Sequence, residues 1–193
     1  MKNGLTEIII LHDCNAPRPD FSKIVRASGM KFFESMKSAR GEIRITYAVF
    51  GGGYKLLAND VPVGKVNLKV KDFEGNGTRD IFDSAGKTIT EKGMAYSAKD
   101  SGEHPENVIF VLVAFGRDNA SKTFAFNQVR DMAGHQSWVY KWKFFCASCD
   151  SVLAEQLDIP EENFVLIEDD IEESFPDALN KLSGRIKESI DNS

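Results

Sequence analysis

Two long apolar runs, each ended by polar residues or glycine, restrict the folds that this chain can adopt. The first run spans residues 7–13 and reads Glu-Ile-Ile-Ile-Leu-His-Asp. The second spans residues 107–115, reads Asn-Val-Ile-Phe-Val-Leu-Val-Ala-Phe, and is closed by Gly116. Unbroken runs of this kind suit strands that are buried on both faces, as in a parallel sheet between layers of helices. We therefore expect an α/β fold.

Four further segments are predicted to be strands. Residues 43–50 form an apolar run, and three consecutive glycines, 51–53, separate it from a short run over 54–58. A glycine triplet between two strands fits a tight reversal, so the run over 54–58 is expected to be an antiparallel edge strand. The last two candidates are residues 142–146 and 164–167.

Helical patterns lie between these runs. Asp20 is the expected N-cap of a helix that carries apolar residues up to Met36. Because strands and helices alternate throughout, the pattern predicts an open, mostly parallel sheet with helices on both faces. The other expected helices span 81–98 with a break near Gly93, 124–138, 151–157, and a last segment that begins near Pro176.

The composition excludes several classes of partner. The chain has 193 residues, with 24 Lys and Arg against 29 Asp and Glu, and a formal net charge of −5. An acidic balance argues against nucleic acid or a membrane surface as the main partner, since both bind clustered cations. No apolar run approaches the ~20 residues of a membrane span. The length predicts a single domain over residues 1–193.

The cysteines and the N-terminal residues are typical of a cytoplasmic protein. Three cysteines, an odd number, do not make a disulfide framework, and the first residues lack the apolar core of a signal peptide. Cys146 and Cys149 form a Cys-x-x-Cys motif. Two buried thiols are favoured there over a redox motif or a zinc site completed by Cys14.

No catalytic motif is present in the sequence. His12, His104 and His135 are scattered and are not paired with a nucleophile. The glycines 51–53 lack the Gly-Lys-Ser/Thr that a phosphate loop requires. We therefore expect a protein that is not an enzyme.

Three aromatic residues stand at alternate positions near residue 140, close to two lysines. Trp138, Tyr140 and Trp142 are separated by Val139 and Lys141, a local pattern that would also suit a stacking platform for single-stranded nucleic acid. Because the total charge is negative, packing of these rings in the core is the favoured interpretation.

Four segments carry a resemblance to one known family. Residues 8–17 form an apolar strand that runs into Asp-Cys-Asn-Ala-Pro, and residues 75–85 hold Gly-Thr-Arg ahead of Asp-Ser-Ala. Residues 111–121 form an apolar strand that ends Phe-Gly-Arg-Asp-Asn-Ala-Ser, and residues 126–145 lead from a helix into a strand. In this order and spacing, the segments resemble the von Willebrand factor A-like (vWA) domains, closest to their compact bacterial and phage branch.

The resemblance implies both a topology and a site. The family has a sheet with strand order 3-2-1-4-5-6, in which strand 3 is antiparallel, and a metal-ion-dependent adhesion site (MIDAS) at its carboxyl edge. Two Ser hydroxyls, a Thr and one or two Asp supply most of the oxygens around a Mg²⁺ ion there. One position stays open for a carboxylate from the partner protein.

Few of those ligands are present here. Asp13 matches the first Asp, and Asn15 stands at the first Ser with an amide oxygen that can still ligate. Pro17 stands at the second Ser and Phe115 at the second Asp, so neither position offers a side-chain oxygen. We therefore expect a degenerate MIDAS and no cofactor. Residual Mg²⁺ binding would rest on Asp13, Asn15 and Thr78.

The family's Thr position has two candidates. Counting forward from Gly77 selects Thr78, whereas counting back from Asp83 selects Arg79. In the second case, the Arg79 guanidinium would occupy the space of the cation and pair with Asp13. The sequence leaves both alternatives open.

The resulting hypothesis is a non-enzymatic interaction or assembly module that binds a protein partner at the carboxyl edge of the sheet. Phe115 is expected to be the apolar anchor of this surface, within a cationic rim that suits an acidic partner. The alternative is a metal-dependent protein, with Mg²⁺ at the MIDAS or Zn²⁺ at the cysteines. The expected location is the cytoplasm, or the host cytoplasm or virion if a phage encodes the chain. The expected partner-binding residues are Asp13, Asn15, Arg18, Thr78, Arg79, Phe115 and Arg117.

Overall fold

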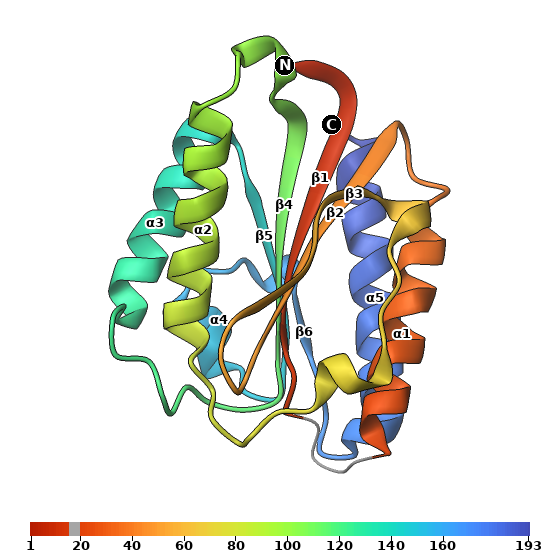
Figure 1. The fold of residues 1–193 in the computed structure, drawn as a ribbon, viewed down its shortest axis with the longest axis vertical. Coiled ribbons are helices and arrows are strands. Elements are labelled where there is room, and N and C mark those ends of the chain that lie inside the picture. The colour runs from red at the N-terminus through yellow and green to blue at the C-terminus, as the bar shows by residue number, and fades with distance from the viewer. Residues whose placement is uncertain (16–19) are drawn as a thin grey trace.

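The computed structural model describes residues 1–15 and 20–193, which form one sheet between two layers of helices (Figure 1). Helices α1 and α5 cover one face of the sheet, and α2 and α3 cover the other. The strands are β1 (Lys2–Asp13), β2 (Glu42–Phe50), β3 (Lys55–Pro62), β4 (Pro105–Ala114), β5 (Lys143–Ser148) and β6 (Phe164–Leu166). The helices are α1 (Phe21–Met36), α2 (Ile81–Ser97), α3 (Phe126–Tyr140), α4 (Val152–Gln156) and α5 (Ile171–Asp191).

The sheet has the strand order β3-β2-β1-β4-β5-β6. Its neighbouring strands are parallel, except that β2 and β3 are antiparallel and are joined across the glycines 51–53. This topology confirms the predicted α/β class, the strand order and the antiparallel edge strand. None of the described helices is both long and apolar enough to cross a bilayer.

Strand β1 explains why an unbroken apolar run belongs at the centre of this sheet. Successive side chains of a strand point to opposite faces. Ile8 and Ile10 therefore pack in the core beneath α1 and α5, whereas Ile9 and Leu11 pack in the core beneath α2 and α3. Each of the four is at most 4% exposed, so the strand is covered on both sides.

Two helices differ from the expectation. α2 runs through Gly93 without a break, because one glycine costs a helix only about 1 kcal/mol and buried residues on both sides of it pack on the sheet. α5 begins at Ile171 rather than near Pro176. Its N-cap is Asp170, whose side chain accepts a hydrogen bond from the Glu173 amide. Because of this cap the helix begins five residues before Pro176, and the proline lies inside the helix.

The aromatic residues near residue 140 do not share one environment. Trp142 is 4% exposed and packs in the core, as expected, but Trp138 and Tyr140 are 81% and 54% exposed. The expectation of core packing is therefore wrong for these two rings. They lie on the last turn of α3, and the left-handed residue Lys141 (φ +60°) then turns the chain inward before β5.

A buried ion pair joins α2 to the middle of the sheet. The Lys92 ammonium contacts the Glu7 carboxylate of β1, and the two side chains are 10% and 1% exposed. The hydroxyls of Thr46 and Tyr96 donate to the same carboxylate, and burial raises the pKa of the Tyr96 phenol. Lys92 also donates to Thr46 Oγ1 at 3.1 Å. Both charges are thus compensated, as charges buried in a protein must be.

Removing one member of this pair should be costly. We expect Lys92→Met to lower the free energy of unfolding by about 3–5 kcal/mol, because it leaves the Glu7 carboxylate buried and unpaired. The matched control is Lys87→Met, which removes a surface pair with Glu91 that spans 3.9 Å on the same helix. Such a pair is worth at most about 0.5 kcal/mol. Urea denaturation measures both variants, and equal losses would contradict a structural role for the buried pair.

Candidate functional site

The candidate site lies at the carboxyl ends of the central strands, at the lower end of the sheet in Figure 1. β1 ends there at Asp13, and β4 is followed there by residues 115–119. The segment 75–79, which leads into α2, closes over the same edge, where Asn15 forms a bridge with Glu74. Open α/β sheets generally bind their ligands at this edge.

Asp13 is the centre of the site. Its side chain is fully buried, and its two oxygens accept four hydrogen bonds. Oδ1 accepts from the backbone amide and from Nδ2 of Asn15, each at 2.8 Å. Oδ2 accepts from Nε of Arg79 at 2.8 Å and from the amide of Phe115 at 3.1 Å. Burial raises the pKa of the Asp13 carboxyl, and these donors oppose the rise.

Asn15 ties the segment 75–79 to β1. Its Nδ2 donates to the carbonyl of Thr78 at 2.7 Å, and its Oδ1 accepts from the amide of Gly77 at 2.7 Å. Two glycines make room for this side chain. A Cβ on Gly51 (φ +113°) would lie 2.3 Å from Asn15 Nδ2, and one on Gly75 would lie 2.2 Å from Oδ1. Neither approach is sterically possible for another residue type without displacing Asn15.

Arg79 is held at both its backbone and its side chain. Its amide donates to Asn119 Oδ1 at 2.6 Å, and its carbonyl accepts from the amides of Asn119 and Ala120. Its guanidinium, 23% exposed, contacts Asp13 through Nε. The guanidinium lies against Gly116, where a Cβ would be 3.3 Å from Cζ. Within the described part of the chain, Nη1 and Nη2 donate no hydrogen bond, and the side chain donates through Nε.

Thr78, the other candidate for the family's Thr position, is turned away from the carboxylate. It is exposed, and its hydroxyl donates to Asn76 Oδ1 at 2.7 Å. Of the two alternatives, the residue beside Asp13 is therefore Arg79. Pro17 and Arg18, which were also expected at this edge, lie outside the described residues.

Phe115 does not have the place expected of an interface anchor. It is 7% exposed, and its ring packs edge-on against Phe21, Phe175 and His12, with ring centroids 5.2–5.5 Å apart. It shares the core beneath α1 and α5 with Val111 and Val113 of β4. The expectation that Phe115 faces a partner is wrong, so Phe115→Ala would open a cavity in the core and not remove a surface contact.

Two acidic side chains near this edge, Asp83 and Asp118, accept hydrogen bonds from the loop after β4. The Asp83 carboxylate accepts amide hydrogen bonds from residues 122, 123 and 124. Burial raises the pKa of Asp83, but these donors leave it below the usual value. Asp118 accepts from the hydroxyl and amide of Ser121. Arg117 is an exposed cation beside these residues. Its side chain is 78% exposed, and its Nε lies 2.8 Å from Oδ2 of Asp150.

The three cysteines do not converge on one point. Cys14 and Cys149 pack on the side of the sheet covered by α1 and α5, whereas Cys146 packs in the core beneath α2 and α3. Burial raises the pKa of the Cys14 and Cys149 thiols to about 11. Outside residues 16–19, no three His, Cys, Asp or Glu side chains are grouped so as to hold a metal ion.

Comparison with known proteins places the fold. The sequence matches no protein-family model and no curated protein. Among solved structures, proximal thread matrix protein 1 (PTMP1) from the mussel byssus matches with a TM-score of 0.66 and 10% identity, over 97% of this chain and 46% of that one. The ArnB paralog VWA2 from Sulfolobus acidocaldarius matches with a TM-score of 0.58 and 12% identity, over 93% and 44%.

The PilB minor pilin from Streptococcus sanguinis matches with a TM-score of 0.64 and 8% identity, over 98% of this chain and 63% of that one. The chain thus spans about half the length of the solved structures it matches. Identities this low establish the fold alone. The chain has a vWA-like fold, as the four segments of its sequence predicted.

His12 lies directly beneath the site and carries no charge at neutral pH. It is 2% exposed, and its Nδ1 lies 2.7 Å from the carbonyl oxygen of Asp13. Its Nε2 has no partner among the described residues. The rings of Tyr47, Phe73 and Phe175 surround the imidazole. Burial lowers its pKa to about 4, and the backbone hydrogen bond opposes this only in part.

We expect His12 to make the fold less stable in acid. Its pKa is about 6.5 in the unfolded chain and about 4 in the folded one, so between these values the unfolded state binds one more proton. Above pH 6.5 the neutral His12 therefore costs the fold no stability. As the pH falls from 6.5 to 4, the free energy of unfolding decreases by about 3 kcal/mol.

Denaturant unfolding across this range, on wild type and His12→Gln, measures the effect. Asp13 titrates in both proteins, so the difference between the two pH profiles isolates His12. Parallel profiles would contradict the depressed pKa.

Proposed function

We propose that this chain is a non-enzymatic protein-interaction module of the vWA type, which binds its partner at the carboxyl edge of the sheet without an adhesion metal. The contact between Arg79 and Asp13 carries the proposal, because it puts a positive charge of the protein itself against the carboxylate. The vWA-like fold supports an interaction role: its structural neighbours include a matrix protein of the mussel byssus and a minor pilin. The single domain and the cytoplasmic location remain predictions.

The oxygens at this edge do not fit a Mg²⁺ ion. Mg²⁺ requires near-octahedral oxygen ligands at about 2.1 Å and loses its water reluctantly. Both oxygens of Asp13 point at N–H donors, and Oδ1 of Asn15 accepts from the Gly77 amide. The Thr78 hydroxyl is directed to Asn76. A ligating oxygen would have to give up these bonds and also face the Arg79 guanidinium. The three cysteines lie on both sides of the sheet, which argues against a zinc site formed by all three of them.

The same arrangement leaves Arg79 able to bind an anion. Nε is used by Asp13, while the two terminal nitrogens make no hydrogen bond within the described residues. A guanidinium presents its N–H groups as a planar fork that matches a carboxylate. Exposed Arg117 adds a second cation, and Asn76 and Asn119 add polar groups around it. This surface suits an acidic patch on a partner protein.

The metal-free proposal predicts that the wild-type protein melts at one temperature after EDTA treatment and with Mg²⁺, Mn²⁺, Ca²⁺ or Zn²⁺ added back. A metal held at about 100 times its dissociation constant would add about 2.7 kcal/mol, or roughly 5–10 °C at this size. In Arg79→Ser the carboxylate loses its cationic partner, so Mn²⁺ should raise the melting temperature of this variant alone. A Mg²⁺ or Mn²⁺ shift in the wild type would contradict the proposal.

Binding at this edge can be tested with a glutamate-rich peptide and ¹⁵N-labelled protein. The expected result is a shift of the amide resonances of residues 76–79 and 116–119. Arg117→Glu should weaken binding by at least about fivefold, roughly 1 kcal/mol. Arg79→Lys keeps the charge beside Asp13 but lacks the fork, and should weaken binding without unfolding the protein.

The matched control is Arg40→Glu, an exposed arginine near the C-terminus of the chain. This variant changes the net charge by the same amount at the opposite end of the sheet. If it weakens binding as much as Arg117→Glu, the attraction is general and the proposed edge is wrong.

A further inference from the structure

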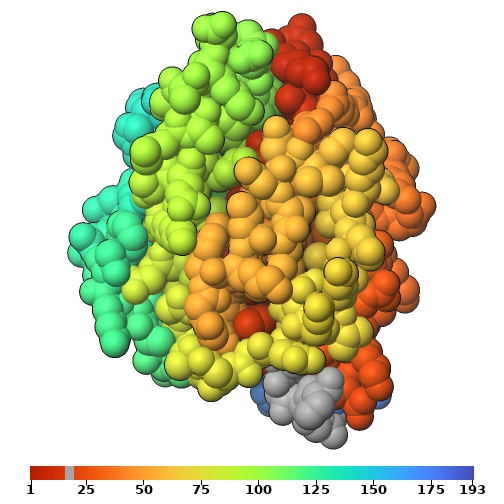
Figure 2. Space-filling model, viewed as in Figure 1, coloured from red at the N-terminus to blue at the C-terminus, as the bar shows by residue number. Residues whose placement is uncertain are grey.

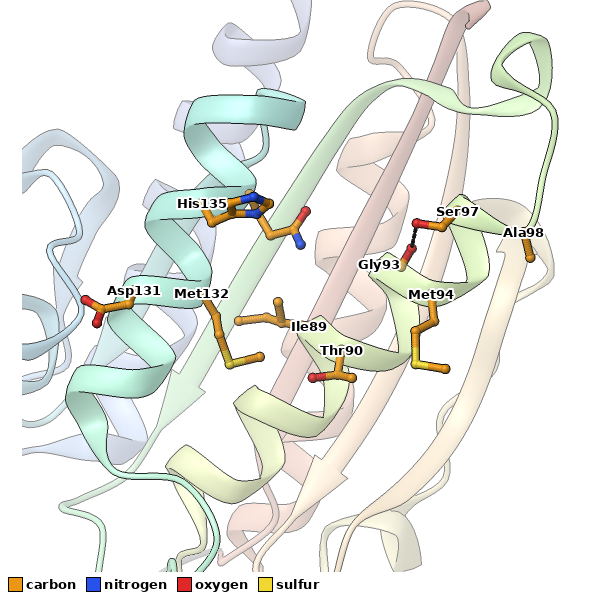
Figure 3. Close-up of a pocket in the computed structure, with 10 residues that line it drawn as sticks. Ile89, Thr90, Gly93, Met94, Ser97, Ala98, Asp131, Met132 and His135 are labelled. Atoms are coloured by element: carbon orange, nitrogen blue, oxygen red, sulfur yellow. Dashed lines mark hydrogen bonds between the residues drawn. The ribbon is translucent and has the colours of Figure 1, made fainter.

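The groove between α2 and α3 holds two adjoining cavities that the proposed partner site does not use. Their volumes are about 860 and 380 Å³, and both are lined by Gly93 of α2 and Gln136 of α3. Figure 3 shows the larger one, in which Ile89 and Met132 point toward one another from the two helices. In Figure 2 the helices lie side by side along one flank of the molecule. The smaller cavity lies at the amino ends of β1 and β4, opposite the carboxyl edge.

Aromatic rings form much of the wall of the smaller cavity. Tyr96 of α2 and Trp142 meet nearly at right angles, with ring centroids 5.9 Å apart. His135 and Tyr140 of α3 are in ring contact at the same distance, and all four residues line the cavity. Its volume of about 380 Å³ lies within the range of about 300–1,000 Å³ that is usual for small-molecule sites. Walls of this kind suit a planar aromatic ligand, because rings pack well edge to face or with an offset stack.

One hydrogen-bond donor of this cavity has no partner in the protein. Trp142 is 4% exposed, and its indole N–H donates no hydrogen bond within the described residues. In the same part of the chain, the fully enclosed side-chain nitrogens and oxygens that lack a partner belong to His12 and Asp80. The indole nitrogen therefore keeps some accessible surface, and the cavity is where Trp142 is accessible. A nearly buried donor needs an acceptor, because leaving it without one is unfavourable.

Gln136 adds a second polar group, and the charges of the cavity favour neither sign. The Gln136 side chain is partly buried, and its amide makes no hydrogen bond within the described part of the chain. The charged side chains of the lining are Lys141 and Glu106, one of each sign. Each already makes a hydrogen bond to the backbone. The cavity therefore suits an uncharged ligand.

Gly93 keeps the groove open between the two helices. A Cβ at this position would lie 3.4 Å from Nε2 of Gln136, which is ordinary van der Waals contact. Alanine would thus fit here, and it would stabilise the middle of a helix relative to glycine. Packing does not require the glycine, whereas any larger side chain at residue 93 would enter the space shared by the two cavities.

We propose that the smaller cavity binds an uncharged, planar aromatic molecule that carries a hydrogen-bond acceptor such as a carbonyl oxygen. The rings of Tyr96 and Tyr140 pack against the ligand, and the indole N–H of Trp142 donates to its acceptor. The Gln136 amide serves a second polar group, and the adjoining larger cavity leaves room for substituents. This inference goes beyond the proposed function and does not depend on it.

Coumarin, a planar bicyclic lactone with a carbonyl acceptor, tests the proposal on the ¹⁵N-labelled full chain. The chain has two tryptophans and hence two indole N–H resonances, which Trp138→Phe assigns. Coumarin should move the Trp142 resonance to saturation, with a dissociation constant of about 4 mM or less for a ligand of this size. Trp138 is 81% exposed and does not line the cavity, so its resonance should stay in place.

Three variants locate the binding. Gly93→Leu fills the groove and should weaken coumarin binding at least about tenfold, with unchanged far-ultraviolet circular dichroism because leucine favours a helix. The matched control is Gly184→Leu, the same change on α5, where a Cβ would have no neighbour within 4 Å; it should bind as the wild type does. Trp142→Phe keeps an aromatic ring without the N–H, and should weaken binding about fivefold, followed through the backbone amides of residues 93 and 136.

Two kinds of result would overturn the proposal. The first is the absence of a saturable shift of the Trp142 resonance up to about 10 mM coumarin, which would leave water as the acceptor of the indole N–H. The second is coumarin binding to Gly93→Leu as tightly as to Gly184→Leu, or to Trp142→Phe as tightly as to the wild type.

Discussion

The carboxyl edge of this molecule depends on charge compensation at Asp13. A carboxylate without exposed surface at the end of a central strand is unfavourable by several kcal/mol unless donors surround it. The donors come from separate parts of the chain, namely Asn15, Arg79 and the amide of Phe115. Satisfying one side chain therefore brings together the ends of β1 and β4 and the segment ahead of α2. A buried pair between Glu7 and Lys92 places α2 on the sheet by the same rule.

The contact between Arg79 and Asp13 limits what the edge can bind. Because the cation is a side chain of the protein, chelators cannot remove it, and its position is fixed by the backbone bonds between Arg79 and Asn119. Glycines 51, 75 and 116 bring the surrounding backbone so close that little space remains beside the carboxylate. The guanidinium is 23% exposed, and its two terminal nitrogens donate no hydrogen bond within the described residues, so they are free to meet the proposed partner. This is the physical basis for proposing metal-independent recognition of an acidic surface.

Much of the fold, but less of the site, could be predicted from the sequence. The apolar runs of β1 and β4 and the glycine triplet define the sheet locally, and the resemblance supplies its order. Thr78 and Arg79 could not be separated, because their register is set by long-range hydrogen bonds to Asn15 and Asn119. The burial of Phe115 was predictable in principle, since strand alternation places it on the same face as Val113.

The most direct test is a double-mutant cycle on the Asp13–Arg79 pair, with Asp13→Asn, Arg79→Met and the two combined. Either single change leaves a buried polar group without its partner, whereas the double change removes both charges. We expect a coupling free energy of at least about 2 kcal/mol from urea unfolding, with the double variant more stable than Arg79→Met. Losses that add to within about 0.5 kcal/mol would show that the two side chains do not interact. That result would contradict the placement of Arg79 as the cation of this site.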